Sequence, residues 1–462
     1  MNRPVPWPAP VAHRPLKAQP RLPASKSLTA RYLVLAGLAQ GPSRIRNALV
    51  SRDTDLMVAG LTSLGARVET VPDVLGTGRE LVIEPGPLRG GQTIDVGLAG
   101  TVMRFLAPVA ALADGRTRFV GDPAAAKRPI RPLLEALNQL GVTTTSQDGT
   151  LEVDRPAKQN SESGEPRPDQ PGPARPRPKN AAQLFTVDGR GGLGGVSGRQ
   201  VWLDAKQSSQ FLSALLLSAP RFNNGLEVSL RPEILPSRPH VEMTLAALSA
   251  FGASHNQTGR FSWTVNPGGL TGGEITVEPD LSNAAPFLAA AVVSGGQTQI
   301  NGWPAVTTQA GQLMLEYLRA FGAQVDLKDG CLTVTGQRYI NGVQLDLTPA
   351  GELTPVVAAL ATLADEDSRL DGIGHLRGHE TDRLAALATE IRRLGGKAQA
   401  GQDYLTIQPS ELHGGLVRSY GDHRMATFGA VIGLRVPGVE IEDINVTTKT
   451  FPGFAAEWTA ML

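Results

Sequence analysis

The sequence predicts an α/β protein of two domains built from a repeated unit, and three observations support this prediction. The chain has 462 residues, long for one hydrophobic core, and 41% of them are hydrophobic, enough to fill cores of that size. A helix–glycine–strand element recurs at spacings of mostly about 70 to 76 residues, as expected of a repeated small α/β unit. A second recurring element consists of strongly apolar helices, which are expected to be buried.

The first element is an apolar helix that ends at a glycine and continues into a strand, as in LTSLGARVE and LRAFGAQVD. Glycine suits the left-handed conformation in which a helix commonly ends before the chain turns into a strand. The pivotal glycines are Gly65, Gly141, Gly252, Gly322 and Gly395.

The second element is a polar turn followed by a helix rich in Ala, Leu and Val. These helices are apolar nearly all round, so we expect them to be buried with their polar starts clustered at one end of a helix bundle. The six copies span residues 25–39, 99–113, 208–219, 282–293, 351–364 and 421–434.

One interval of the repeat is about 35 residues too long, and it contains residues 154–180. This stretch is crowded with Pro, Arg, Glu and Gln and has almost no aliphatic or aromatic residues, which predicts a disordered surface insertion. A nucleic-acid-binding segment is the alternative, although the charges of the stretch are mixed in sign.

The bulk charge and the termini exclude several classes of protein. The net charge of +1 gives no overall field that would recruit nucleic acid or a membrane surface, so neither partner is expected. Cys331 is the one cysteine, which excludes an internal disulfide and fits a reducing compartment. The proline-rich start does not resemble a signal peptide, and no apolar run approaches a membrane span. A cytoplasmic monomer is expected.

The starts of the six apolar helices predict an anion-binding site. Each buried helix leaves unpaired N–H groups and a partial positive charge at its start, yet cationic side chains recur there. Bound phosphate or carboxylate groups would neutralise this charge. Singly, such residues are more often solvated cations or helix caps. The candidate residues at these starts are Ser25, Lys26, Ser27, Arg31, Thr101, Arg104, Ser208, Ser209, His423 and Arg424, with Arg128, Arg238, Arg383 and Lys449 at other turns.

Two acids, Glu352 and Glu380, stand among these cations. An ionised carboxylate in such a site can accept a proton from a hydroxyl. The alternative for Glu352 is a favourable charge at the start of its helix. The sequence has no nucleotide-binding loop, no zinc-protease motif and no nucleophile elbow, so no cofactor and no metal is expected.

Seven ordered motifs resemble the enolpyruvyl transferases, in particular those that act on shikimate 3-phosphate. They are LPASKSLTAR, GLAGTVMR, KRPI, SSQFLSALL, HETDRL, GDHRMA and KTFP, and they span residues 22–454. The resemblance implies two similar domains, each of three βαβαββ units with buried parallel helices, an inside-out α/β barrel. It implies that residues 1–24 and 279–462 form one domain and residues 25–278 the other.

The resemblance also implies a reaction in which the 5-hydroxyl of shikimate 3-phosphate attacks C2 of phosphoenolpyruvate and phosphate then leaves. Glu352 would be the base, and Lys26 and Glu380 would serve proton transfer at the methylene. The implied contacts to shikimate 3-phosphate are Lys26, Ser27, Arg31, Ser208, Ser209, Gln210, Ser237, Glu352 and His379. Those to phosphoenolpyruvate are Lys26, Gly100, Arg128, Gln210, Arg383, Arg424 and Lys449.

Several positions depart from the family pattern. Ala124 replaces an arginine that would bind phosphoenolpyruvate, so Lys127 or Arg128 would have to take over that contact. The other departures are Glu352 for Asp, Leu98 for Asn, His240 for Tyr, His375 for Asn and His379 for Lys.

Two rival functions follow from the same residues. A sister transferase that acts on UDP-N-acetylglucosamine usually carries a catalytic Cys in the loop that here reads GDPAAAKRPI. A ligand-sensing or scaffolding protein that kept the fold and lost the chemistry is the other rival, and Ala124 is its best support.

Overall fold

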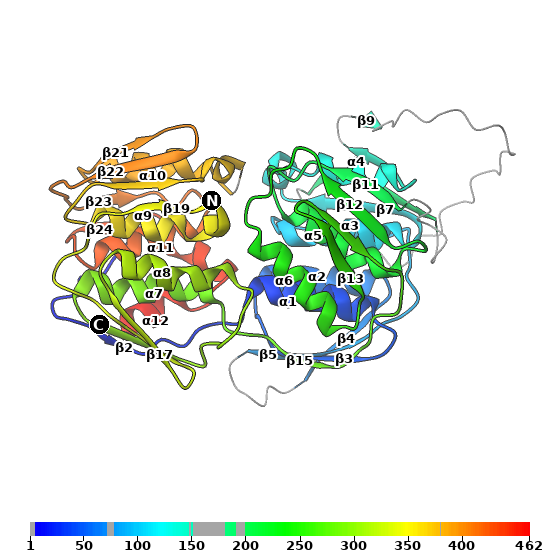
Figure 1. The fold of residues 1–462 in the computed structure, drawn as a ribbon, viewed down its shortest axis with the longest axis horizontal. Helices are drawn as coiled ribbons and strands as arrows, with labels where there is room; N and C mark the ends of the chain where they lie inside the picture. Colours follow the sequence, from blue (N-terminus) through cyan, green and yellow to red (C-terminus); the bar gives the residue numbers. More distant parts are fainter. Residues whose placement is uncertain (1–4, 72–77, 147–148, 151–180, 191–198, 379) are drawn as a thin grey trace, which may run out of the picture.

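The computed structural model describes residues 5–71, 78–146, 149–150, 181–190, 199–378 and 380–462. The chain forms two lobes that lie side by side (Figure 1). We call residues 5–24 with 279–462 the first lobe and residues 25–278 the second lobe. The predicted insertion 154–180 lies outside the described residues.

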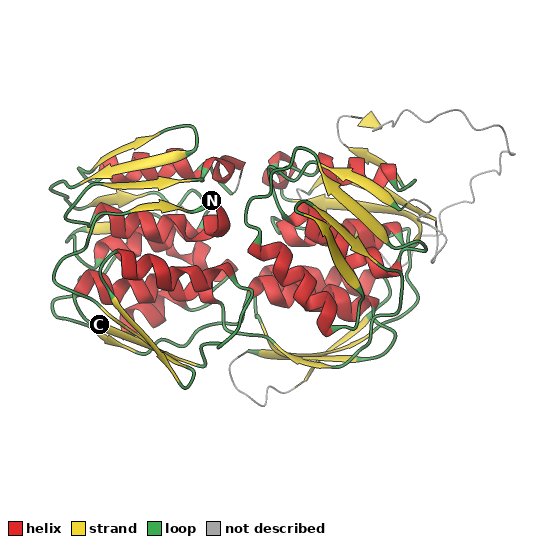
Figure 2. Cartoon of the chain, in the orientation of Figure 1, coloured by secondary structure: helices red, strands yellow, loops and turns green. Residues whose placement is uncertain are grey.

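Each lobe has its own hydrophobic core. One cluster of buried side chains runs from Leu28 to Val277 and also takes in Ala24, the last residue before the second lobe. A separate cluster combines Ala9 and Leu16 with residues from Leu281 to Trp458. In each lobe, helices lie between sheets on the outside (Figure 2). The predicted α/β class is confirmed.

The described part of the second lobe contains three sheets. Their strands, in order across each sheet, are β15 (Glu274–Thr276), β3 (Ser43–Ala48), β5 (Arg79–Glu84) and β4 (Arg67–Val71); β6 (Thr93–Asp95), β7 (Asp114–Gly121), β10 (Ala182–Arg190), β8 (Thr143–Ser146) and β9 (Gly149–Thr150); and β11 (Gln200–Leu203), β12 (Leu226–Leu230), β14 (Ser262–Val265) and β13 (His255–Gly259).

The first lobe also contains three sheets over its described residues. Their strands are β17 (Gln324–Lys328), β18 (Cys331–Thr335), β16 (Gln297–Asn301) and β2 (Lys17–Ala18); β19 (Gln344–Asp346), β20 (Ser368–Asp371), β22 (Tyr404–Gln408) and β21 (Lys397–Ala400); and β1 (Trp7–Pro8), β24 (Val439–Ile441) and β23 (Gly415–Val417).

The six apolar helices predicted from the sequence form the interior of the lobes. Helices α1 (Lys26–Leu38), α3 (Gly100–Ala111) and α5 (Gln210–Ser218) pack together in the second lobe, and α7 (Leu281–Ser294), α9 (Thr354–Thr362) and α11 (His423–Gly433) in the first. All 12 residues of α3 are buried, because a helix that is apolar on every face has no side to give to water.

The remaining helices carry a polar face and lie further out. They are α2 (Arg52–Ser63), α4 (Arg131–Gln139), α6 (Pro239–Ala250), α8 (Met314–Ala320), α10 (Arg383–Arg393) and α12 (Phe454–Ala460), with 3-10 turns at η1 (Pro123–Lys127), η3 (Ala219–Arg221), η4 (Ala310–Leu313), η5 (Thr348–Leu353), η6 (Gly374–Gly378) and η7 (Ile444–Lys449). The five glycines predicted to end helices all have positive φ, between +77° at Gly252 and +118° at Gly65. No helix in the described ranges is both long and apolar enough to cross a lipid bilayer.

The chain crosses between the lobes twice, and the two crossings meet. Ala24 and Pro279 form an isolated antiparallel bridge. Asp280 follows directly and caps two helices at once. Its Oδ1 accepts from Asn283 N of α7 at 2.9 Å, and its Oδ2 accepts from Lys26 N of α1 at 3.2 Å. One carboxylate thus joins the starts of two helices that belong to different lobes.

Candidate active site

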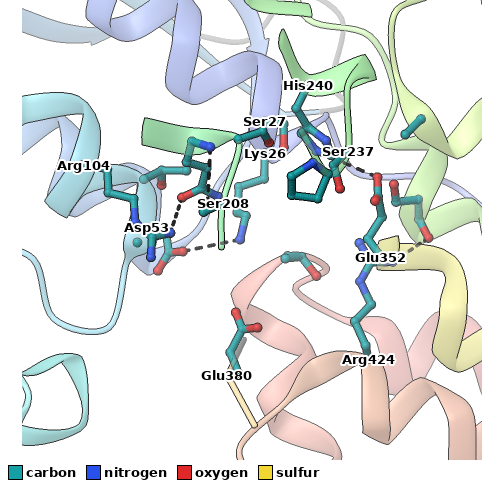
Figure 3. A pocket seen from close by; sticks show the side chains of 18 of the residues that line it. Lys26, Ser27, Asp53, Arg104, Ser208, Ser237, His240, Glu352, Glu380 and Arg424 are labelled. Atoms are coloured by element: carbon teal, nitrogen blue, oxygen red, sulfur yellow. Dashed lines mark hydrogen bonds and ion pairs between the residues drawn. The ribbon is translucent and has the colours of Figure 1, made fainter. Parts of the chain in front are cut away.

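The starts of all six inner helices border one cavity between the lobes (Figure 3), as predicted. It encloses about 1220 Å³, part of it open to solvent. The sequence-predicted residues that line it are Ser25, Lys26, Ser27, Gly100, Thr101, Arg104, Arg128, Ser208, Ser209, Gln210, Ser237, Glu352, Glu380, Arg383, His423, Arg424 and Lys449. Arg31 does not line it, and His379 lies outside the described residues.

Lys26 begins α1, where Ser25 is the N-cap. Its ammonium lies 3.6 Å from a carboxylate oxygen of Asp53. Burial lowers the pKa of Lys26; Asp53 and Glu380 oppose this shift, while Lys449 and Arg424 add to it. A cation placed where burial and like charges both work against it is stabilised by a bound anion.

On the second lobe, two arginines lie near the start of α3, one in the helix itself and one in the loop that follows η1. Arg104 donates to Gln210 Oε1 at 2.7 Å, and burial together with nearby Arg128 lowers the pKa of Arg104 to about 9. Arg128 donates to Leu98 O at 2.8 Å and lies over Gly100. Arg128 lines the cavity whereas Lys127, at the exposed end of η1, does not.

On the first lobe, a chain of ion pairs surrounds Glu380. Lys449 Nζ donates to its Oε1 at 2.7 Å and Arg383 Nη2 to its Oε2 at 3.1 Å. Burial alone would raise the pKa of Glu380, but Lys449 and Arg383 outweigh it and hold that pKa well below its usual range. Arg383 also donates to both carboxylate oxygens of Asp422, at 2.7 and 3.2 Å.

Asp422 is fully buried beneath this network. It is the N-cap of α11 and accepts from Arg424 N at 2.8 Å. The Arg424 guanidinium reaches back to the start of α7, where it donates to Ser282 O at 2.9 Å. Burial lowers the pKa of Arg424. The two arginines of this lobe are therefore held in place before any ligand arrives.

Glu352 lies in η5, before the first turn of α9, and faces the cavity. The nearest cross-cleft partner is His240, whose Nε2 is 3.8 Å from Glu352 Oε1. The ring of His375 lies against Gly351, where it would be 2.4 Å from an added Cβ. The carboxylate therefore faces His240 across the cavity and precedes the first turn of its helix.

Arg31 lies behind the cavity wall and is only 1% exposed. Its guanidinium donates to Thr244 Oγ1 at 2.8 Å and to the carbonyl oxygens of Ser27 and His240, each at 2.9 Å. Burial lowers its pKa to about 9. These contacts connect two segments of the wall, so the structure gives Arg31 a place in the second layer of the site.

Sequence reasoning did not single out several polar residues that line the cavity. Asp53, Asp280, Gln207, Ser282 and Gln309 are among them. Asp280 carried a usable signal, because an Asp directly before an apolar helix is a typical N-cap. Gln309 had none, since only its fold places its amide near the crossing, where it donates to Glu278 Oε2 at 2.7 Å.

The charge balance of the cavity defines its chemistry. Among the described lining residues, six cations (Lys26, Arg104, Arg128, Arg383, Arg424 and Lys449) face four acids (Asp53, Asp280, Glu352 and Glu380). Helix starts, hydroxyls and arginine forks all favour phosphate or carboxylate. The site is suited to hold two anionic molecules beside acids that can move protons.

Comparisons with known proteins agree with this geometry. The family model of EPSP synthase (3-phosphoshikimate 1-carboxyvinyltransferase) matches residues 11–162 and 182–458. A 3-phosphoshikimate 1-carboxyvinyltransferase of Kocuria rhizophila is 48% identical over 462 residues, covering 99% of this chain and 96% of that protein.

Two solved structures share the fold. EPSP synthase from Acinetobacter baumannii is 21% identical with a TM-score of 0.75, covering 99% of this chain and 97% of that one. The enolpyruvyl transferase NikO from Streptomyces tendae is 15% identical with a TM-score of 0.73, covering 100% and 98%. Together, the matched family model and the close relative show that the chain belongs to the EPSP synthase family.

Proposed function

We propose that this chain transfers the enolpyruvyl group of phosphoenolpyruvate to the 5-hydroxyl of shikimate 3-phosphate and releases phosphate. The reaction belongs to the shikimate pathway, which leads to chorismate and the aromatic amino acids. The observation that carries the proposal is the cavity between the lobes, where six cations surround Glu352 and Glu380.

Shikimate 3-phosphate binds mainly to the second lobe. Lys26, Ser27, Ser208 and Ser209 come from the starts of two inner helices and hold its phosphate, with Gln210 and Ser237 beside them. Arg31 acts from behind this wall, through the carbonyl of Ser27. The positions of Lys26 and Arg31 support these different roles, because Lys26 lines the cavity and Arg31 does not.

Phosphoenolpyruvate binds between the lobes. Gly100 and Arg128 approach it from the second lobe, and Arg383, Arg424 and Lys449 from the first. Arg128 takes the contact that Ala124 cannot make. Cations on both sides of one ligand attract the lobes toward each other, so binding favours a closed cleft from which water is expelled.

Glu352 accepts the proton of the 5-hydroxyl as that oxygen attacks C2, and a proton is delivered to C3. For this delivery, the charges favour Lys26 over Glu380. The lowered pKa of Lys26 makes its ammonium a better acid, whereas Glu380 is held ionised by Lys449 and Arg383. Glu380 then acts by holding these two cations. Loss of phosphate from C2 and of a proton from C3 restores the double bond.

The two lobes act as domains, residues 1–24 with 279–462 and residues 25–278, and the enzyme works in the cytoplasm as a monomer. The separate hydrophobic cores support this division. The test of function is to mix the purified chain with both substrates and follow phosphate release, with UDP-N-acetylglucosamine as control acceptor. Phosphate release from phosphoenolpyruvate is expected when shikimate 3-phosphate is the acceptor and not when UDP-N-acetylglucosamine is. Release only with the control acceptor would identify the sister reaction, and tight binding without release would identify a non-catalytic protein.

Gly100→Ala is expected to raise the KM for phosphoenolpyruvate roughly tenfold or more, with a smaller effect on kcat. An added Cβ would lie 2.9 Å from Cζ of Arg128, so the guanidinium must leave its position. Steady-state kinetics with each substrate varied in turn measures this. Gly268→Ala is the matched control, because no atom lies within 4 Å of its added Cβ. An unchanged KM would contradict the placement of phosphoenolpyruvate at Gly100.

A further inference from the structure

We propose that His240 is a positioning residue for Glu352, whose Nε2–H donates across the cleft to one carboxylate oxygen and turns the other toward the acceptor hydroxyl. The inference rests on the proposed function and deepens it. It concerns a contact between the lobes, since His240 lies in the first turn of α6 in the second lobe and Glu352 lies in η5 of the first.

Two neighbouring contacts join these segments. His240 Nε2 and Glu352 Oε1 are 3.8 Å apart, with side chains 21% and 16% exposed. Three residues earlier, Ser237 N donates to Thr348 O at 3.1 Å, and Ser237 has a positive φ of +52°. Figure 3 shows His240 and Ser237 on the side of the cavity opposite Arg424, with Glu352 between. A further approach of about 1 Å brings the imidazole within hydrogen-bond distance.

The backbone of His240 is firmly held. Its carbonyl oxygen accepts from Arg31 Nη2 and from Thr244 Oγ1, each at 2.9 Å. Arg31 simultaneously donates to Ser27 O. The backbone that carries the imidazole is therefore held relative to Ser27, which lines the wall where shikimate 3-phosphate is proposed to bind. This gives the buried Arg31 a function that requires no direct contact with substrate.

The surroundings of the ring determine its tautomer. Among the described residues, Nδ1 of His240 is buried and has no hydrogen-bond partner. A proton there would be an unsatisfied buried donor, whereas a proton on Nε2 points at a carboxylate. Burial lowers the pKa of His240, Arg31 and Arg424 lower it further, and Glu352 and Asp280 oppose them. The ring is therefore neutral at pH 7 and donates from Nε2.

The other groups that face Glu352 cannot do the same work. Arg383 and Arg424 are engaged with Asp422 and Ser282. His375 lies against the backbone of Gly351, and burial lowers its pKa. Burial raises the pKa of Tyr317, and the nearby charge of Glu352 raises it further. Of these groups, His240 alone approaches from the lobe that holds the acceptor.

The chemical step balances without a change at His240. The O–H bond of the acceptor hydroxyl breaks and its proton passes to the free oxygen of Glu352. The oxygen's electron pair forms the bond to C2 of phosphoenolpyruvate, while the C2–C3 double bond opens and its electron pair takes the proton delivered to C3. The imidazole keeps its Nε2 proton throughout. Two departures from the family pattern, His240 and Glu352, thus meet in one pair.

The experiment compares His240→Phe with His240→Gln, whose side-chain amide supplies an N–H near the position of Nε2. His240→Phe is expected to lose about ten- to a hundredfold in kcat. The acid limb of its kcat profile should move to higher pH by about one unit, because the ionised carboxylate loses a hydrogen-bond donor that favours its charged form. His240→Gln should stay within roughly threefold of the wild type. His255→Gln, on outer strand β13, is the control.

Equal losses in both His240 variants, or an unmoved acid limb in His240→Phe, would overturn the proposal. A second measurement requires neither turnover nor the two His240 variants. Titration of the seven histidines by NMR with ring-labelled histidine should show that Glu352→Gln lowers the pKa of His240 further, because the carboxylate raises it. An unchanged titration would overturn the pairing. If wild-type turnover were absent while this coupling was present, the proposed function would fail and the pairing would stand.

Discussion

Glu352→Gln is expected to reduce turnover by roughly 10²- to 10⁴-fold while both substrates still bind. The amide keeps the size of the side chain and its place beside His240, but it cannot accept the proton of the 5-hydroxyl. The phosphate and carboxylate contacts are made by other residues, so ground-state binding is largely preserved. Phosphate release measures the first effect, and calorimetric titration with each substrate measures the second.

Glu411→Gln serves as the control for this variant, because Glu411 is exposed and lies outside the cavity. It makes the same chemical change and should leave turnover near normal. If Glu352→Gln also turned over at a near-normal rate, Glu352 would no longer be the base. Loss of binding along with turnover would show instead that its charge organises the cavity.

Arg383→Met is expected to destabilise the free protein by about 3–5 kcal/mol and to abolish phosphoenolpyruvate binding. Asp422 is fully buried and receives two hydrogen bonds from this arginine. Removal of the guanidinium leaves that carboxylate buried and charged, with the backbone N–H of Arg424 still donating to it. Glu380 loses one of its two cations at the same time. Denaturant unfolding monitored by circular dichroism measures the loss.

A double variant separates the two effects of Arg383. Adding Asp422→Asn to Arg383→Met removes the stranded charge, so stability should recover by roughly half or more, while phosphoenolpyruvate binding stays lost. Since the two lobes have separate cores, they can unfold in separate transitions, and the first-lobe transition should be the one that shifts. An Arg383→Met variant as stable as the wild type would contradict the buried pairing.

The inner helices were predictable because they are defined by local composition. Apolar faces all round and a polar start suffice to predict burial and a shared end, and the structure bears this out for α1, α3 and α11. The short strands β2 and β15 have two and three residues, too few for a periodic pattern. Their pairings with β16 and β3 depend on where the chain crosses between lobes.

Many residues that line the cavity were candidates from the sequence, but how deeply each side chain lies was not predictable. Arg31 was expected to bind shikimate 3-phosphate, and in the structure it lies behind the cavity wall, where neutral acceptors from α1 and α6 surround its guanidinium. Sequence alone left Lys127 and Arg128 as alternatives for the missing arginine. The turn η1 ends between them and directs only Arg128 inward. Such contacts join residues far apart in the chain, which local patterns do not encode.

The two hydrogen bonds that Asp280 accepts at the crossing have a consequence for any rotation of one lobe against the other. Atoms close to a pivot sweep short arcs and distant ones sweep long arcs. The backbone of Lys26 donates to Asp280 at the crossing, so such a rotation would move it little. The residue proposed to deliver a proton to one ligand while touching the other is thus anchored where motion is least.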